Sequence, residues 1–226
     1  MTRLQGIIFD FNGTLLKDSN WHEDAWITIA SKLRTKPLTV DEFQHNGHGR
    51  SNKEIITYLL GREPSAQELE TVVDEKELMY RTVCLQKRNE FHLAPGVISF
   101  LDGAKELGIP STIATGSYAT NVDFYFNHFQ LSHWFQRSNV VLDDGTYQGK
   151  PAPFIFQIAA KKLCLDPSEC LVFEDSYSGI ESAWKAGVGH IVAVEPLLKP
   201  ELVNAPNELI TFTNGFEAIK ISDYFN

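Results

Sequence analysis

The alternation of short apolar runs with amphipathic segments is the feature that most limits the fold of this chain. Apolar runs without internal alternation predict strands buried on both faces, at 111–114, 139–142, 171–173, 190–194 and 209–212. Amphipathic segments predict helices at 97–107, 119–129 and 154–163, with a further helix that Ser178 caps and Gly187 ends. Strands that alternate with helices imply right-handed crossovers, so we predict an α/β fold with a parallel sheet.

The N-terminal part of the chain shows a different pattern, in which helical segments predominate. Ile7-Ile8-Phe9 predicts one more buried strand. After it, apolar residues at helical spacing predict a helix at about 20–35. Capping-box patterns that begin at Ser51 and Ser65 predict helices that end near Leu60 and Lys87. With no strand expected at 15–90, we predict a helical domain at 15–92, inserted into a sheet domain of 1–14 and 93–226.

Composition and charge exclude several classes of protein. The 226 residues are 43% hydrophobic, which is enough for a core and too much for a disordered chain. The 20 basic and 29 acidic residues give a net charge of −9, which disfavours nucleic-acid and anionic-membrane partners. The 3 cysteines form neither a disulfide framework nor a zinc motif. No apolar stretch reaches the length of a membrane span or a signal peptide, so we expect a cytoplasmic location.

Polar residues that suit catalysis lie at four strand or helix boundaries. Ligands of parallel sheets bind beyond the carboxyl ends of the strands, so we expect these residues to meet there. A carboxylate in that place attacks phosphorus or binds magnesium, while hydroxyl and N–H groups suit an oxyanion. Each stretch alone is also typical of an ordinary turn, a helix cap or an exposed loop. The four stretches are Asp10 to Thr14, Thr115-Gly116-Ser117, Lys150 to Pro153 and Glu174-Asp175-Ser176.

Together these stretches resemble the motifs of the haloacid dehalogenase (HAD) superfamily of phosphotransferases. The resemblance covers essentially the whole chain and is strongest to beta-phosphoglucomutase-like members, which carry a helical cap after the first strand. It implies a Rossmann-like core in three layers and a dependence on Mg²⁺. The matching stretches are Phe9-Asp10-Phe11-Asn12-Gly13-Thr14-Leu15, Ala114-Thr115-Gly116-Ser117, Gly149-Lys150-Pro151-Ala152-Pro153 and Val172-Phe173-Glu174-Asp175-Ser176, with Gly179-Ile180 and Ala186-Gly187 behind them.

The same resemblance implies a role for each site residue. Asp10 is expected to attack phosphorus and form an aspartyl-phosphate. Thr115 and Lys150 are expected to hold the phosphoryl oxygens, and Gly116 and Ser117 to bind substrate beside them. The Mg²⁺ ligands are expected to be Asp10, the backbone carbonyl of Asn12, and Asp175, with Glu174 nearby. Such an arrangement stabilises the transferring group by preorganised charge.

Asn12 departs from the family pattern, which has an aspartate as general acid and base at this position. An amide cannot transfer a proton, and general acid–base catalysis contributes about 10²–10⁴-fold to a rate. We therefore predict a slow enzyme that prefers acyl and aryl phosphates, whose leaving groups need no proton. One alternative is that His22 moves the proton instead. Another is that Asn12-Gly13 deamidates, which would place a carboxylate at this position.

The predicted helical domain is expected to choose the substrate. Arg50 lies at the start of a predicted helix and is suited to a phosphate or carboxylate far from the reacting centre. Its position is similar to that of the cap arginine of beta-phosphoglucomutases. An ordinary exposed loop arginine is the alternative.

We therefore predict a Mg²⁺-dependent phosphatase that acts on a small phosphorylated metabolite, such as a sugar phosphate, and that is a monomer. The first alternative is a phosphomutase, which His22 and Arg50 favour and Asn12 disfavours. The second is a catalytically weak protein that binds or senses a phosphometabolite. A dehalogenase is disfavoured because Lys150 and the pair Glu174-Asp175 suit Mg²⁺ and phosphate better.

Overall fold

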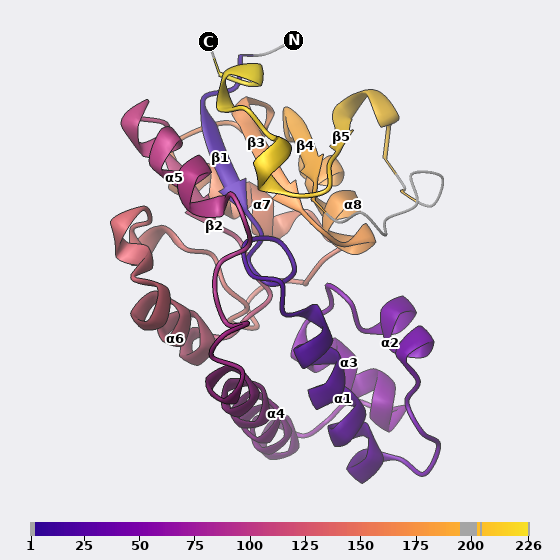
Figure 1. The fold of residues 1–226 in the computed structure, drawn as a ribbon. Helices are drawn as coiled ribbons and strands as arrows, with labels where there is room; N and C mark the ends of the chain where they lie inside the picture. Colours follow the sequence, from indigo (N-terminus) through magenta and orange to yellow (C-terminus); the bar gives the residue numbers. More distant parts are fainter. Residues whose placement is uncertain (1–2, 195–202, 204, 226) are drawn as a thin grey trace. The chain divides into compact units, whose positions relative to one another are not determined.

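The computed structural model describes residues 3–194, 203 and 205–225 and consists of two compact units, each described by itself (Figure 1). The sheet unit comprises residues 1–17 and 93–226, and the helical unit residues 18–92. The first boundary falls after residue 17, later than predicted, because Leu15 and Leu16 are buried in the sheet unit. The Ala94 N–H donates to the Leu15 carbonyl at 2.9 Å, and Leu16 pairs with Leu93.

The sheet unit is built on five parallel strands in the order β2-β1-β3-β4-β5, which confirms the predicted fold class. Strand β1 lies between β2 and β3, where Phe9 is flanked by Ile113 of β2 and Phe173 of β3. This order places the carboxyl ends of β1 and β3 side by side. The strands are β1 (Gly6–Phe9), β2 (Ser111–Ile113), β3 (Cys170–Glu174), β4 (His190–Ala193) and β5 (Ile210–Phe212).

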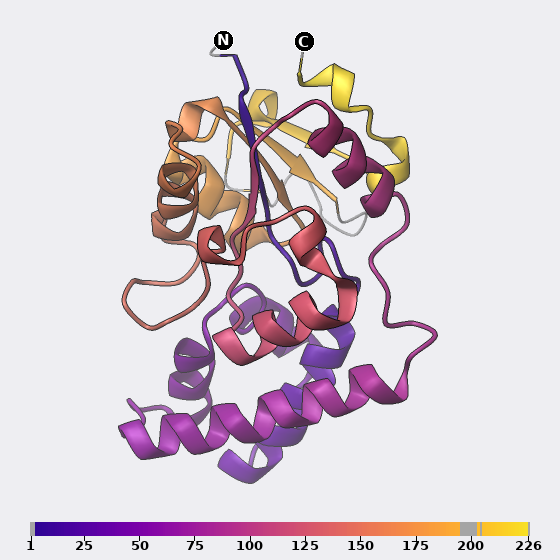
Figure 2. The same cartoon turned by 90° about the vertical axis from the view of Figure 1, so that its left-hand side faces the viewer.

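Helices cover both faces of the sheet (Figure 2). Successive residues of a strand point to opposite faces, and β1 divides its apolar residues accordingly. Phe9 stacks on Phe173 with ring centroids 5.0 Å apart, on the face that Phe100 of α5 covers. Ile8 belongs to the apolar cluster under the opposite helices, α7 and α8. The helices of this unit are α5 (Val97–Glu106), α6 (Ala119–Phe129), α7 (Phe154–Lys162) and α8 (Tyr177–Ala186).

Two predicted elements of the sheet unit differ from the structure. The predicted strand at 139–142 is wrong, because the chain forms a 3₁₀ turn at Arg137–Asn139 and then a single bridge between Ala114 and Val141. A single bridge does not add a further strand to the sheet. Helix α8 is capped by Ser176 rather than Ser178, since Ser176 has an extended backbone and its hydroxyl accepts from the Gly179 N–H.

The helical unit contains α1 (Ser19–Leu33), α2 (Val40–Asn46), α3 (Asn52–Leu60) and α4 (Ala66–Gln86). Both predicted capping boxes are confirmed, at Ser51 with Glu54 and at Ser65 with Glu68. Helix α2 was not predicted, because it is short and its only strong signal is the N-cap Thr39. In the part of the chain that the structure describes, every helix is too short or too polar to cross a membrane.

A buried polar network fills the helical unit between α1, α3 and α4. Lys76 donates to the Nδ1 atom of His22 at 2.8 Å and to Glu77 at 3.0 Å. Glu77 also accepts from the amide of Asn52 at 2.9 Å. Burial alone would raise the pKa of Glu77, but the charge of Lys76 together with these hydrogen bonds holds it at about 2. Glu77 is therefore ionised, and its charge depends on Lys76.

We expect Phe9→Ala to destabilise the sheet unit by about 3–5 kcal/mol, because it opens a cavity among the stacked rings. Urea unfolding followed by circular dichroism measures this loss. Ile98→Ala on α5 is the control, since Ile98 is 53% exposed and its truncation leaves no cavity. Equal losses of unfolding free energy in Phe9→Ala and Ile98→Ala would contradict the packing described for β1.

The network of the helical unit gives a second prediction. Lys76→Met leaves the carboxylate of Glu77 buried without its cation, so we expect a loss of about 3–5 kcal/mol. The double variant Lys76→Met/Glu77→Gln removes that charge and is expected to recover most of the loss. Urea unfolding at neutral pH compares the two, and a double variant as unstable as the single one would count against the ion pair.

Candidate active site

The loop after β1 places the first candidate residue. Asp10 is buried, and its N–H donates to the Phe173 carbonyl of β3 at 2.9 Å. The chain then turns back at once: Gly13 has a φ of +85°, and its N–H donates to the Leu16 carbonyl at 2.7 Å. A positive φ of this kind is the reason that glycine occupies position 13. The turn fixes the Asp10 carboxylate beyond the carboxyl end of β1.

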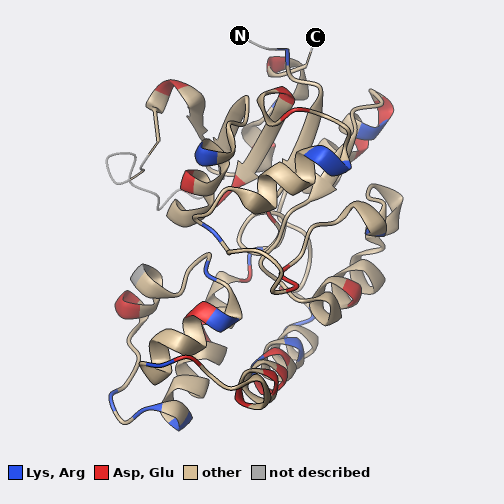
Figure 3. Ribbon diagram, turned by 180° about the vertical axis from the view of Figure 1, so that it is seen from behind, with Lys and Arg blue, Asp and Glu red and all other residues tan. Residues whose placement is uncertain are grey.

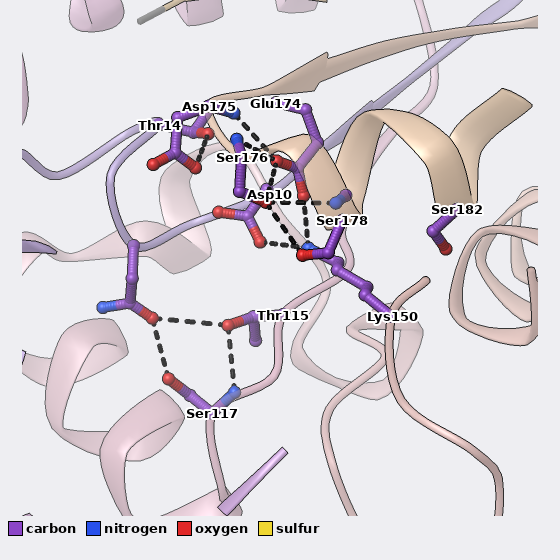
Figure 4. Close-up of polar contacts among 12 residues, drawn as sticks. Asp10, Thr14, Thr115, Ser117, Lys150, Glu174, Asp175, Ser176, Ser178 and Ser182 are labelled. Carbon is purple, nitrogen blue, oxygen red and sulfur yellow. Dashed lines mark hydrogen bonds and ion pairs between the residues drawn. The ribbon is translucent and has the colours of Figure 1, made fainter. Parts of the chain in front are cut away.

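Lys150 joins the carboxylates of two strands. Its ammonium donates to Oδ1 of Asp10 at 2.6 Å and to Oε1 of Glu174 at the end of β3 (Figure 4). All three side chains are buried. Burial alone would lower the pKa of Lys150, but the charges of Asp10 and Glu174 outweigh it and raise the pKa. The lysine is therefore a fixed positive charge beside Asp10.

Hydrogen bonds and close packing fix the position of the Glu174 carboxylate. Its Oε2 atom accepts from the N–H groups of Asp175 at 2.8 Å and Ser176 at 2.9 Å, and from the Ser176 hydroxyl at 3.0 Å. Gly179 of α8 packs directly on this carboxylate, and a methyl group there would overlap it. Both carboxylate oxygens thus serve to hold Lys150 and the following loop.

Asp175 lies among like charges. Its Oδ1 atom accepts from the Thr14 hydroxyl at 3.2 Å (Figure 4). Burial, together with the charges of Glu174 and Asp10, raises the pKa of Asp175 well above its usual value, and Lys17 and Lys150 offset this only in part. A carboxylate under such repulsion is stabilised by a bound cation.

The donors around Asp175 fit Mg²⁺ by their chemistry. Carboxylate and carbonyl oxygens are the ligands that Mg²⁺ prefers, and it commonly takes one or two carboxylates and completes its shell with water and substrate phosphate. Asp10 and Asp175 are two such carboxylates near one another. Among the residues with described positions, no three His, Cys, Asp or Glu side chains are grouped so as to hold a metal ion by themselves.

Asn12 meets the loop that follows β2. Its Oδ1 atom accepts from the Ser117 hydroxyl at 2.8 Å and from the Thr115 hydroxyl at 3.4 Å (Figure 4). The Ser117 N–H in turn donates to the Thr115 hydroxyl at 3.1 Å, so Gly116 lies at the centre of a tight turn. On its other side, the Asn12 amide donates to the Tyr125 hydroxyl at 3.0 Å. Sequence reasoning missed Tyr125, because a tyrosine on a helix face is usually a core residue.

The other two predicted substrate residues lie in the helical unit. His22 is part of its buried network: the ring stacks on Tyr80 at 3.8 Å, and Nε2 lies 3.4 Å from Asp18. Lys76 donates to its Nδ1 atom, so Nδ1 is the unprotonated nitrogen of the ring. Arg50 is exposed just before α3. The sequence pattern could not reveal the partners of His22, because they come from distant parts of the chain.

Comparisons with known proteins agree with this geometry. The model of the haloacid dehalogenase-like hydrolase family matches residues 4–187. A HAD hydrolase of family IA, variant 3, from Entamoeba histolytica has 34% sequence identity and a TM-score of 0.84, over 98% of this chain and 97% of that one. Fructose-1-phosphate phosphatase YqaB of Escherichia coli is 27% identical over 82% of this chain and 94% of its own. Hexitol phosphatase A of the same organism is 26% identical over 97% of this chain and 95% of its own length. The chain belongs to the haloacid dehalogenase-like hydrolases.

Proposed function

We propose that this hydrolase is a phosphatase that cleaves a small phosphorylated metabolite, and that its substrates are sugar phosphates. The observation that carries the proposal is the buried carboxylate of Asp10, which Lys150 holds at the carboxyl end of β1. A carboxylate beside a fixed cation suits attack on a phosphate, because the cation attracts the dianion that the nucleophile would otherwise repel. Similarity to phosphatases named for fructose-1-phosphate and hexitol substrates supports the substrate class.

In the proposed mechanism, an oxygen of Asp10 attacks phosphorus and the ester bond to the alcohol breaks. The product is an aspartyl-phosphate and an alkoxide, which takes up a proton. Water then attacks phosphorus, the bond to Asp10 breaks, and inorganic phosphate leaves. Lys150 and the Thr115 hydroxyl hold the phosphoryl oxygens through both steps, with N–H groups of the turn at Gly116 and Ser117 beside them.

Asp10, Asp175 and the Asn12 carbonyl are the residues that would hold Mg²⁺. When bound, the ion neutralises charge on the transferring phosphoryl group. Glu174 is a positioning residue in this proposal rather than a ligand, because its two oxygens hold Lys150 and the backbone of the next loop. The helical unit is the cap that selects the substrate, with Arg50 as the residue for a distant anionic group.

Asn12 determines which substrates react fast. Its amide has no proton to give the alkoxide, so the leaving group must depart unaided. His22 is poorly suited to replace it, since its ring stacks on Tyr80 and its Nδ1 atom accepts a hydrogen bond from Lys76. The same asparagine favours one other function, a protein that binds a phosphometabolite and turns it over weakly or not at all. The asparagine disfavours a mutase, because a mutase must move protons to and from sugar hydroxyls in each cycle.

The panel of substrates that separates these functions is acetyl phosphate, an aryl phosphate and several sugar phosphates. We expect Mg²⁺-dependent phosphate release that is fast on the first two and slow on the sugars. Asn12→Asp is expected to raise the sugar phosphate rate by about 10²-fold or more and to leave the acyl phosphate rate nearly unchanged.

Asp10→Asn is the control for this panel, since it removes the proposed nucleophile and should abolish release from every substrate. Tight sugar phosphate binding by the unaltered chain, without release from any substrate, would favour the binding protein. Turnover that requires a bisphosphate primer would favour the mutase. Equal sugar phosphate rates for the unaltered chain and Asn12→Asp would refute the account of position 12.

Gly179→Ala tests the positioning of Lys150 without touching it. The added methyl group displaces the Glu174 carboxylate, so Lys150 loses one of its two anionic partners and shifts from the phosphoryl site. We expect acetyl phosphate turnover to fall at least tenfold, on the scale of about 1.4 kcal/mol of lost transition-state stabilisation. Gly103→Ala is the matched control: Gly103 is also in a helix, its Cβ position is open, and its replacement should be neutral or stabilising.

A further inference from the structure

The chain contains three Asn-Gly dipeptides, which begin at Asn12, Asn46 and Asn214. This pair is prone to spontaneous deamidation, because glycine has no side chain to hinder the approach of its own nitrogen. In that reaction the glycine nitrogen bonds to Cγ of the asparagine, the Cγ–Nδ2 bond breaks, and ammonia leaves with the proton of the former N–H. Water then opens the resulting succinimide to aspartate or isoaspartate. The structure gives the three pairs different surroundings.

The pair Asn12-Gly13 is restrained at both reacting groups. The nucleophile is the Gly13 nitrogen, whose N–H donates to the Leu16 carbonyl at 2.7 Å, so the proton that must leave is engaged. The electrophile is the Asn12 carboxamide, whose Oδ1 accepts from the Ser117 hydroxyl at 2.8 Å and whose Nδ2 donates to the Tyr125 hydroxyl at 3.0 Å. Closing the ring turns the planar carboxamide tetrahedral and moves it toward the main chain, which opposes both contacts.

The pair Asn214-Gly215 has none of these restraints. It lies between β5 and the 3₁₀ turn at Phe216–Ala218. Asn214 is exposed, and within the described ranges of the chain neither its carboxamide nor the Gly215 N–H forms a hydrogen bond. Neither reacting group therefore has to leave a partner before the ring closes.

The pair Asn46-Gly47 at the end of α2 is intermediate. Asn46 is exposed, but its Nδ2 donates to the Glu42 carbonyl at 2.9 Å, and the Gly47 N–H donates to the Phe43 carbonyl at 2.6 Å. Both bonds lie within one short helix, so fraying of its last turn frees the pair. Freeing Asn12 is harder, because its carboxamide must part from the loop after β2 and from α6.

We propose that Asn214 is the site of spontaneous deamidation in the folded chain, and that the fold preserves Asn12 as an amide. The three pairs react by the same chemistry, so the hydrogen bonds of each pair set its rate. Asn214 reacts first, Asn46 more slowly and Asn12 last. The inference does not depend on the proposed function. It does imply that an aspartate does not accumulate at position 12 of the folded protein, so deamidation is not the source of any sugar phosphate turnover.

The test is incubation of the full chain in mildly alkaline buffer, folded in one sample and unfolded in urea in another. Peptide mapping by mass spectrometry follows the replacement of NH₂ by OH at each asparagine. In the folded chain we expect Asn214 to convert at least about tenfold faster than Asn12, which must first lose its hydrogen bonds. In urea we expect the three pairs to convert at similar rates, since no folded structure distinguishes them.

Variants locate the protection of Asn12. Ser117→Ala and Tyr125→Phe each remove one hydroxyl and keep the rest of the side chain. We expect each to speed the conversion of Asn12 about fivefold, as the loss of one ordinary hydrogen bond predicts, and to leave Asn214 unaffected. Ser138→Ala is the matched control and should change neither rate, since Ser138 is exposed and its hydroxyl has no partner among the residues that the structure describes.

Equal rates for Asn12 and Asn214 in the folded chain would overturn the proposal. Conversion of Asn214 in urea but not in the folded chain would overturn it as well. Unchanged conversion of Asn12 in both Ser117→Ala and Tyr125→Phe would refute the protection assigned to these hydroxyls. None of these results bears on whether the chain is a phosphatase, because that proposal is tested by phosphate release.

Discussion

The ion pairs of Lys150 with Asp10 and Glu174 are the interactions on which the rest of the sheet unit depends. Three buried charges are stable only when each has a partner and further hydrogen bonds, because a lone buried charge costs several kcal/mol. Glu174 meets this demand through two N–H groups and the Ser176 hydroxyl, and Gly179 leaves it the space. The order of the strands is what brings the pair together, since β1 and β3 are neighbours and end at the same edge.

The rigidity of that edge comes from the packing below it. Phe9 and Phe173 immediately precede Asp10 and Glu174, and their rings stack on each other. Phe100 of α5 meets both rings edge to face, and Phe216 stacks on Phe173. The packed rings therefore fix the backbone positions of Asp10 and Glu174, which follow them directly in the chain. Charged residues are dispersed over the ribbon of both units of this chain, which has a net charge of −9 (Figure 3). The carboxylates of the site, Asp10, Glu174 and Asp175, are a local concentration of negative charge. Lys150 offsets part of that concentration, and its hydrogen bonds to Asp10 and Glu174 hold it in place.

Local signals in the sequence predicted most of the fold. Capping boxes at Ser51 and Ser65 and the apolar run of β1 depend on neighbouring residues, and these predictions were confirmed. The predicted strand at 139–142 failed because an apolar run does not reveal whether a neighbouring strand continues alongside it. For the same reason, the sequence could not predict which distant segments come into contact. His22 with Lys76, Asn12 with Tyr125, and Lys17 with Val194 each join residues whose proximity only the folded chain creates.

The surroundings of Asn12 also bear on what an aspartate would do in its place. The hydroxyls of Ser117, Thr115 and Tyr125 all lie within hydrogen-bonding distance of the amide, and a hydroxyl can donate as well as accept. A carboxylate would therefore be satisfied there without rearrangement, so the variant should keep its fold. The same hydroxyls would hold that carboxyl in the orientation of the Asn12 amide. An aspartate at position 12 would consequently differ from Asn12 in its ability to carry a proton rather than in its place, so the gain should fall on substrates whose alcohol needs a proton to leave.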